Sequence, residues 1–110
     1  MKNWEEGVNF SVTVCDTGGR ILKMNRKAAE TFKMTGGETA GKDLLDCHPE
    51  PARSKLKKML AAPFTNVYTI EKKGLKKLIY QTPWYEDGKP AGLVELSFEI
   101  PADMPHFIRK

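Results

Sequence analysis

The chain has 110 residues, of which 40% are hydrophobic and 29% are charged, and 18 Lys and Arg against 14 Asp and Glu give a formal net charge of +4. This length is typical of one domain with one core, so we expect residues 1–110 to form a single domain. The sequence holds no apolar run of the roughly 18 to 20 residues that a membrane helix needs. Its first residues do not have the pattern of a secretory signal, so we expect a cytoplasmic protein without membrane contact.

The basic residues gather in two places, but the net charge is ordinary for a small domain. The groups are Arg53, Lys55, Lys57 and Lys58, and Lys72, Lys73, Lys76 and Lys77. They are typical of a solvated helix face and of a charged hairpin tip. The sequence lacks the aromatic and glycine motif of an RNA-binding sheet, so we expect no nucleic-acid partner.

The first third of the chain predicts a hairpin followed by a helix. Residues 11–16 alternate small polar and β-branched side chains, Gly18 and Gly19 supply a turn, and residues 20–24 resume an extended pattern. A helix is predicted over 26–32, with Asn25 as its N-cap. The side-chain oxygen of Asn25 can accept hydrogen bonds from the first free backbone N–H groups of that helix.

A second helix and three strands follow. Pro51 suits the first turn of a helix that runs to about Ala61. Its apolar stripe consists of Ala52, Leu56, Met59 and Leu60. Extended runs are predicted over residues 66–72, 77–83 and 91–100, with a turn at Gly74 and a hairpin signal at Asp87-Gly88.

This order of elements predicts an α+β fold with an antiparallel sheet and helices on one face. The last strand has one apolar parity, formed by Val94, Leu96, Phe98 and Ile100. We expect the helices to cover that apolar side and to leave a space between helices and strands for a small ligand.

The sequence resembles the PAS sensor-domain family across essentially its whole length. The resemblance is carried by Asp16-Thr-Gly-Gly-Arg-Ile, Met24-Asn25, Tyr85-Glu-Asp-Gly and Gly92-Leu-Val-Glu-Leu. It implies a five-stranded sheet of order 2-1-5-4-3, with short helices over a small-ligand cavity. More narrowly, residues 44–53 resemble the small bacterial branch that contains a Cys-His-Pro motif.

The resemblance also implies how such a module works. Residues 1–10 would form an N-terminal cap segment and residues 101–110 a tail, so we expect no attached output domain. Signalling would then pass through association with a partner protein, without catalysis, since no nucleophile or acid–base constellation can be assembled from the sequence. The leading hypothesis is a stand-alone sensory module that binds a small ligand or a partner protein.

His48 and its neighbour Cys47 are the first candidates for a binding role. An imidazole titrates near neutral pH and can ligate a metal. In some gas-sensing PAS proteins a histidine of the helical segment holds haem, which gives a haem-based gas or redox sensor as one alternative. His48 can also organise its loop or contact an organic ligand, and no cofactor is required by the sequence.

Aromatic residues supply the remaining candidates. Tyr68 and Tyr80 are proposed to line the cavity, although core packing is the favoured role of Tyr80. Trp4, Val8 and Phe10 make the N-terminal segment more apolar than a free tail, so we expect them to pack on the sheet or on a second subunit in a homodimer. A ligand-free interaction scaffold is the second alternative, and it is favoured if side chains fill the cavity.

Overall fold

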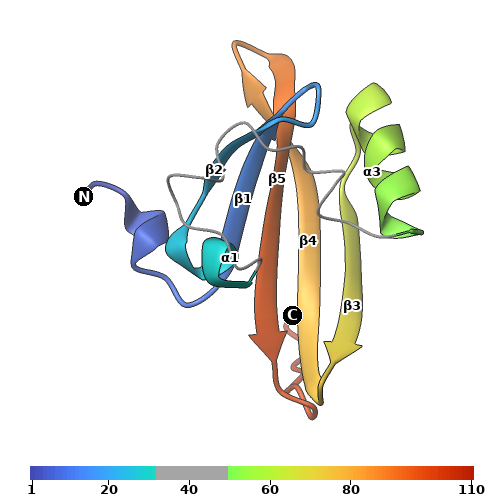
Figure 1. Cartoon of the computed structure of the whole chain (residues 1–110). Coiled ribbons are helices and arrows are strands. Elements are labelled where there is room, and N and C mark those ends of the chain that lie inside the picture. Colours follow the sequence, from blue (N-terminus) through green and yellow to red (C-terminus); the bar gives the residue numbers. More distant parts are fainter. Residues whose placement is uncertain (32–49) are drawn as a thin grey trace.

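The computed structural model describes residues 1–31 and 50–110, and its centre is one five-stranded antiparallel sheet (Figure 1). The strand order is β2-β1-β5-β4-β3, which confirms the predicted topology. The elements are η1 (Trp4–Glu6), β1 (Ser11–Asp16), β2 (Ile21–Met24), α1 (Arg26–Thr31), α3 (Ala52–Ala61), β3 (Asn66–Lys72), β4 (Leu75–Glu86) and β5 (Lys89–Ile100). Among the described residues, no helix is long and apolar enough to cross a membrane.

Two tight turns set the pairing of the last three strands. Lys73 and Gly74 have φ of 53° and 79°, and Asp87 and Gly88 have φ of 52° and 77°. Two consecutive positive φ values are characteristic of the two-residue hairpin turn that matches the twist of the strands. The strands therefore pair right up to the turns, and both β4 and β5 extend further toward Asp87-Gly88 than the sequence pattern predicts.

The prediction that Asn25 caps the first helix is confirmed. Its Oδ1 accepts a hydrogen bond from the backbone N–H of Ala28 at 2.9 Å, three residues into the turn. The same oxygen accepts the N–H of Val12 on β1 at 3.0 Å. One side chain therefore starts α1 and ties it to the sheet.

The core lies between α3, α1 and one face of the sheet. Leu56 and Met59 on the predicted apolar stripe of α3 are completely buried. They pack with residues of β1, β2, α1 and β5, and the cluster consists of Cys15, Ile21, Met24, Ala28, Leu56, Met59 and Leu93. Both helices thus cover the same side of the sheet, which we call the inner face.

The side of β5 that faces the helices is not the one that the sequence predicts. Leu93 packs in the core on the inner face, and Glu95 and Ser97 line the space beneath the helices. The apolar residues at even-numbered positions 94–100 lie on the opposite, outer face, where they are only half-buried. The prediction that the helices cover the more apolar side of this strand is therefore wrong.

A β-bulge between Trp84 and Tyr85 explains the difference. Counting back from the tight turn without a bulge places Gln81 opposite Val94. The bulge adds one residue to the count on β5, so that Gln81 pairs with Glu95. Because side chains alternate between the faces of a strand, a shift of one residue exchanges the faces of β5.

Candidate ligand-binding site

A cavity of about 740 Å³ lies between the inner face of the sheet and the start of α3, and it reaches the end of α1. This volume is within the range of small-molecule sites in proteins. The described residues that line it are Ser11, Thr13, Thr31, Glu50, Pro51, Ala52, Lys55, Asn66, Tyr68, Ile70, Lys72, Lys77, Ile79, Glu95 and Ser97. The structure therefore contains the space for a ligand that the order of elements predicts.

Two rows of residues run across four strands at the floor of the cavity, and all of them except the buried Gln81 line it. We call the first the polar row, and in cross-strand order it consists of Thr13, Glu95, Gln81 and Asn66. The second row, in the same order of strands, consists of Ser11, Ser97, Ile79 and Tyr68. Directly opposed residues of neighbouring strands have Cβ atoms roughly 4.5 to 5.5 Å apart, so each row is a chain of contacts.

Hydrogen bonds connect the polar row. Asn66 Nδ2 donates to Gln81 Oε1 at 2.9 Å, and Gln81 Nε2 donates to Glu95 Oε1 at 3.1 Å. Gln81 Nε2 also approaches the hydroxyl oxygen of Tyr68 at 3.5 Å, which is long for a hydrogen bond. Gln81 is 1% exposed and Glu95 is 8% exposed. The buried amide therefore fixes the position of a buried carboxylate on the cavity floor.

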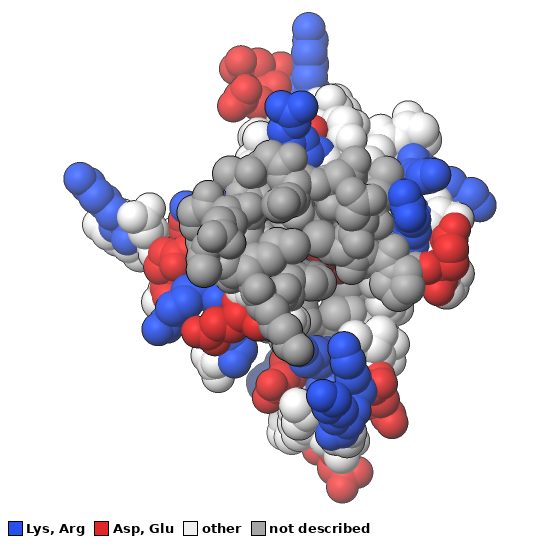
Figure 2. Space-filling view, viewed as in Figure 1, with Lys and Arg blue, Asp and Glu red and all other residues white. Residues whose placement is uncertain are grey.

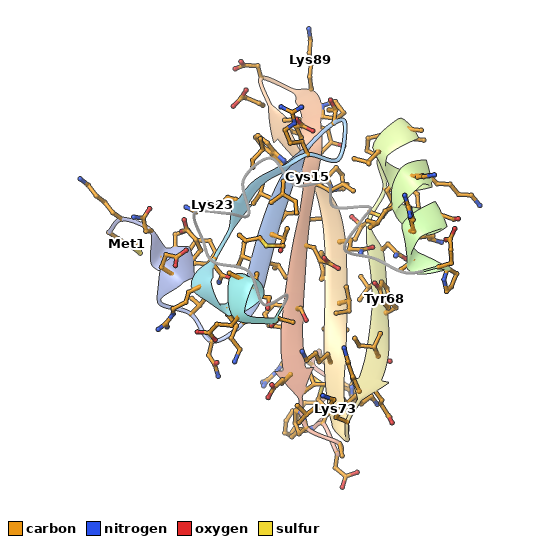
Figure 3. All side chains as sticks on the ribbon, viewed as in Figure 1. Met1, Cys15, Lys23, Tyr68, Lys73 and Lys89 are labelled. Atoms are coloured by element: carbon orange, nitrogen blue, oxygen red, sulfur yellow. The ribbon has the colours of Figure 1, made fainter. Side chains whose placement is uncertain are left out.

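Tyr68 lines the cavity, and its side chain extends from β3 (Figure 3). Burial raises the pKa of its hydroxyl, and the negative charge of Glu95 raises it further, while the hydrogen bond from Gln81 opposes the shift. Both main causes disfavour a phenolate at this place. The fold therefore holds Tyr68 in its neutral form, as a hydroxyl that can donate.

We expect a tyrosine titration step above the ordinary pKa of about 10, and we expect Tyr68→Phe to remove it. The sign follows from the raised pKa: the contribution of Tyr68 to the free energy of unfolding is complete below about pH 10 and is lost as the pH rises through the folded pKa. Tyrosinate absorbance measured against pH checks this. A Tyr68→Phe protein that keeps the late step would contradict the assignment.

Positive charges lie at the mouth of the cavity, at the end where β3 turns into β4. Lys72 is exposed and Lys77 is partly exposed, and Figure 2 shows basic side chains gathered at this end of the molecule. Lys77 lies opposite Glu99 in the pairing of β4 with β5. Lys55, on the helix side, places its ammonium 5.4 Å from the centre of the Phe64 ring.

Glu50 also lines the cavity, but its carboxylate is engaged by the start of α3. It accepts hydrogen bonds from the Ser54 backbone N–H at 2.9 Å and from the Ser54 hydroxyl at 2.7 Å. These bonds lower the pKa of Glu50. This carboxylate therefore serves as a cap of the helix.

The predicted site residues have different positions. Tyr68 lines the cavity, as expected. Tyr80 lies on the outer face between Val67 and Leu96, with 38% of its surface exposed, so its predicted place in the cavity is corrected. The reason is strand alternation, because Ile79 and Gln81 take the inner positions. Cys47 and His48 lie outside the described residues, and their roles remain predictions.

The N-terminal candidates lie beside the sheet. Phe10 packs on Phe98 of the outer face, with ring centroids 4.6 Å apart. Val8 is half-buried, whereas Trp4 in η1 is 53% exposed. The segment is therefore anchored on the domain and still presents an indole ring to solvent.

Glu95, Gln81 and Asn66 were not among the predicted site residues. One signal was present: each is a polar residue inside a strand, at an inner position once the strands are paired. These three side chains are neighbours only because of the register in which β3, β4 and β5 pair, and the bulge in the pairing of β4 with β5 is part of that register. A pattern read along one strand at a time does not contain that information.

A five-stranded antiparallel sheet of order 2-1-5-4-3, with short helices packed on one face, defines a class of α+β domains. The chain belongs to the PAS fold family, whose family model matches residues 6–102. The narrower assignment to the branch with a Cys-His-Pro motif remains a prediction.

Solved structures share this fold at low sequence identity. A sensory box sensor histidine kinase from Vibrio cholerae is 18% identical, with a TM-score of 0.68, over 86% of this chain and 84% of that one. The PAS domain of BvgS from Bordetella pertussis is 18% identical, with a TM-score of 0.65, over 87% and 80% of the two chains. The PAS domain of an HTR-like protein from Haloarcula marismortui is 13% identical, with a TM-score of 0.62, over 86% and 90%. A search of curated proteins finds no match.

Proposed function

We propose that this chain is a sensory module that binds a small organic molecule in the cavity and signals by associating with another protein chain. The observation that carries the proposal is the cavity of about 740 Å³ with a hydrogen-bonded polar floor. A space of this size with a few converging polar groups is the usual form of a small-molecule site. It also argues against a ligand-free scaffold whose side chains fill the interior.

The outer face of the sheet is the proposed surface for association, with a second copy of the chain as the first candidate partner. Val67 and Tyr80 are 48% and 38% exposed there, and Trp4 lies on the anchored N-terminal segment. Exposed apolar surface of this kind commonly marks an interface. β1 contributes residues to the cavity floor and also contacts the N-terminal segment through Asn25, so occupancy of the cavity can change the population of association-competent forms.

Native mass spectrometry of freshly purified protein tests both parts of the proposal. We expect a dimer that carries a small-molecule adduct, and we expect denaturation to release the adduct as a free compound. A bare monomer at all concentrations would contradict the ligand and the association surface together. A haem adduct would instead support the alternative that rests on His48, and His48→Ala would then have to abolish it.

A further inference from the structure

We propose that the cavity selects an amine: a ligand with an apolar or aromatic body and a protonated nitrogen held by the carboxylate of Glu95 and the hydroxyls of Thr13 and Ser97. The inference rests on the proposed function, because it assigns the chemistry of the ligand that the cavity takes. It is carried by the charges around the cavity, by the hydrogen-bonding groups of its floor and by the apolar remainder of its wall.

A carboxylate lies at the bottom of the cavity. Among the described lining residues, Glu95 is the charged side chain that is buried, at 8% exposure. The positive charges of Lys55 and Lys72 belong to exposed residues, and Lys77 faces Glu99 across the strand pair. Interactions of exposed charges are weakened by water and salt, whereas the interactions of a buried charge are screened much less. A ligand that reaches the floor therefore meets a carboxylate.

The groups around Glu95 suit the three N–H donors of an ammonium group. Gln81 donates to Glu95 Oε1 and holds the carboxylate in place, and Glu95 makes further contacts besides. Thr13 lies directly opposite Glu95 on β1, and Ser97 lies two residues further along β5 on the same face. Within the described part of the chain, neither hydroxyl makes a hydrogen bond to another side chain. The floor thus combines one charged acceptor with two hydroxyl oxygens.

The rest of the wall favours an apolar ligand body. Ile70 and Ile79 line the cavity from the sheet and Pro51 lines it from the start of α3, and Tyr68 lies in the same row as Ile79. Among the described residues, the one contact that the hydroxyl of Tyr68 accepts is the long one from Gln81, and this hydroxyl can donate to an acceptor on the ligand. An amine with an aromatic or branched aliphatic body matches both parts of this surface.

Three indole compounds of similar shape separate the charge preference from the fit. Tryptamine carries an ammonium group, tryptophol a neutral hydroxyl and indole-3-acetate a carboxylate. Isothermal titration of each into the full chain should show tryptamine binding roughly tenfold or more tighter than tryptophol, since a hydrogen bond to a charged group is worth this much. Indole-3-acetate should bind weakest, because its carboxylate meets Glu95.

Glu95→Gln is the matching variant, since it removes the charge and keeps the shape. It should lower tryptamine affinity roughly tenfold and leave tryptophol affinity unchanged. Glu99→Gln is the control, because Glu99 has the same parity on the same strand but does not line the cavity. It should change neither affinity. The ranking of the three probes on the unmutated protein needs no variant, so a Glu95→Gln protein that fails to fold leaves the test intact.

The possible failures are distinguishable. Tighter binding of tryptophol or indole-3-acetate than of tryptamine overturns the amine assignment and leaves a ligand-binding cavity. Equal loss of tryptamine affinity in Glu95→Gln and Glu99→Gln shows a general charge effect and also overturns it. Binding of none of the three probes overturns the inference, and the proposed function fails with it only if native mass spectrometry also finds no adduct.

Discussion

Gly92→Ala should be the most damaging single substitution outside the core, with a loss of roughly 3 to 5 kcal/mol in the free energy of unfolding. A Cβ built at Gly92 meets the backbone oxygen of Cys15 at 1.8 Å and the carbonyl carbon of Cys15 at 2.7 Å. The residue also has a φ of 150°, which is rare for residues with a side chain. Both the close approach of β1 and the backbone conformation of β5 thus require glycine here.

The carbonyl group of Cys15 cannot rotate away from the added Cβ as a side chain could, because it belongs to the backbone of β1. The oxygen of Cys15 also accepts a hydrogen bond from Trp84 Nε1 at 3.0 Å, so β1, β4 and β5 meet at this point. Trp84 pairs with Gly92 next to the bulge. Added bulk at Gly92 would push β1 away and break that bond, with loss of pairing across the centre of the sheet.

Urea unfolding of Gly92→Ala beside Gly88→Ala provides the measurement and its control. Gly88 also has positive φ, but nothing lies within 4 Å of its ideal Cβ, so only the backbone strain of about 1 kcal/mol is expected. If the two variants lose the same stability, the close approach of Cys15 to Gly92 is not a property of the native protein.

Asn25→Asp should cost roughly 3 kcal/mol or more, although the two side chains have the same shape. The amide nitrogen of Asn25 donates to the backbone oxygens of Glu5 at 2.7 Å and Phe10 at 2.9 Å, while its oxygen accepts from two backbone N–H groups. The residue is 1% exposed. An ionised carboxyl keeps the two accepted bonds but places negative charge against two carbonyl oxygens, and both lose their donor.

The pH dependence makes this result diagnostic. The ionised form is disfavoured in the fold, so the introduced carboxyl should have a pKa above the ordinary value of about 3.9. A raised pKa means that stability is gained as the pH falls through it, because the protonated group can donate one bond again. The deficit relative to the unmutated protein should therefore shrink between about pH 7 and about pH 4.5 in urea unfolding.

Asn9→Asp is the matched control for this substitution. Asn9 is exposed, so the same chemical change should alter stability by no more than about 0.5 kcal/mol. A deficit in Asn25→Asp that is equally small, or that grows on acidification, would show that the hydrogen bonds from Asn25 to Glu5 and Phe10 do not hold the N-terminal segment to the domain.

Local sequence patterns determined most of the architecture. Three kinds of local feature were predicted and are confirmed: the turns at Gly74 and Asp87-Gly88, the helix cap at Asn25 and the apolar stripe of α3. Each depends on residues that are only a few positions apart in the sequence. The order of the elements predicted an antiparallel sheet with helices on one face, and the family resemblance implied its strand order. These features were predictable because backbone conformation and amphipathic periods are properties of short segments.

Only the tertiary structure decided which side chains meet in the cavity. The bulge at Trp84 and Tyr85 turns Glu95 toward Gln81 and leaves the apolar parity of β5 on the outer face. It also follows from pairing that Tyr68 lines the cavity and Tyr80 does not. A bulge changes the register by one residue, and each such step exchanges the two faces of a strand. The chemistry of the floor therefore depends on contacts between strands that no single segment encodes.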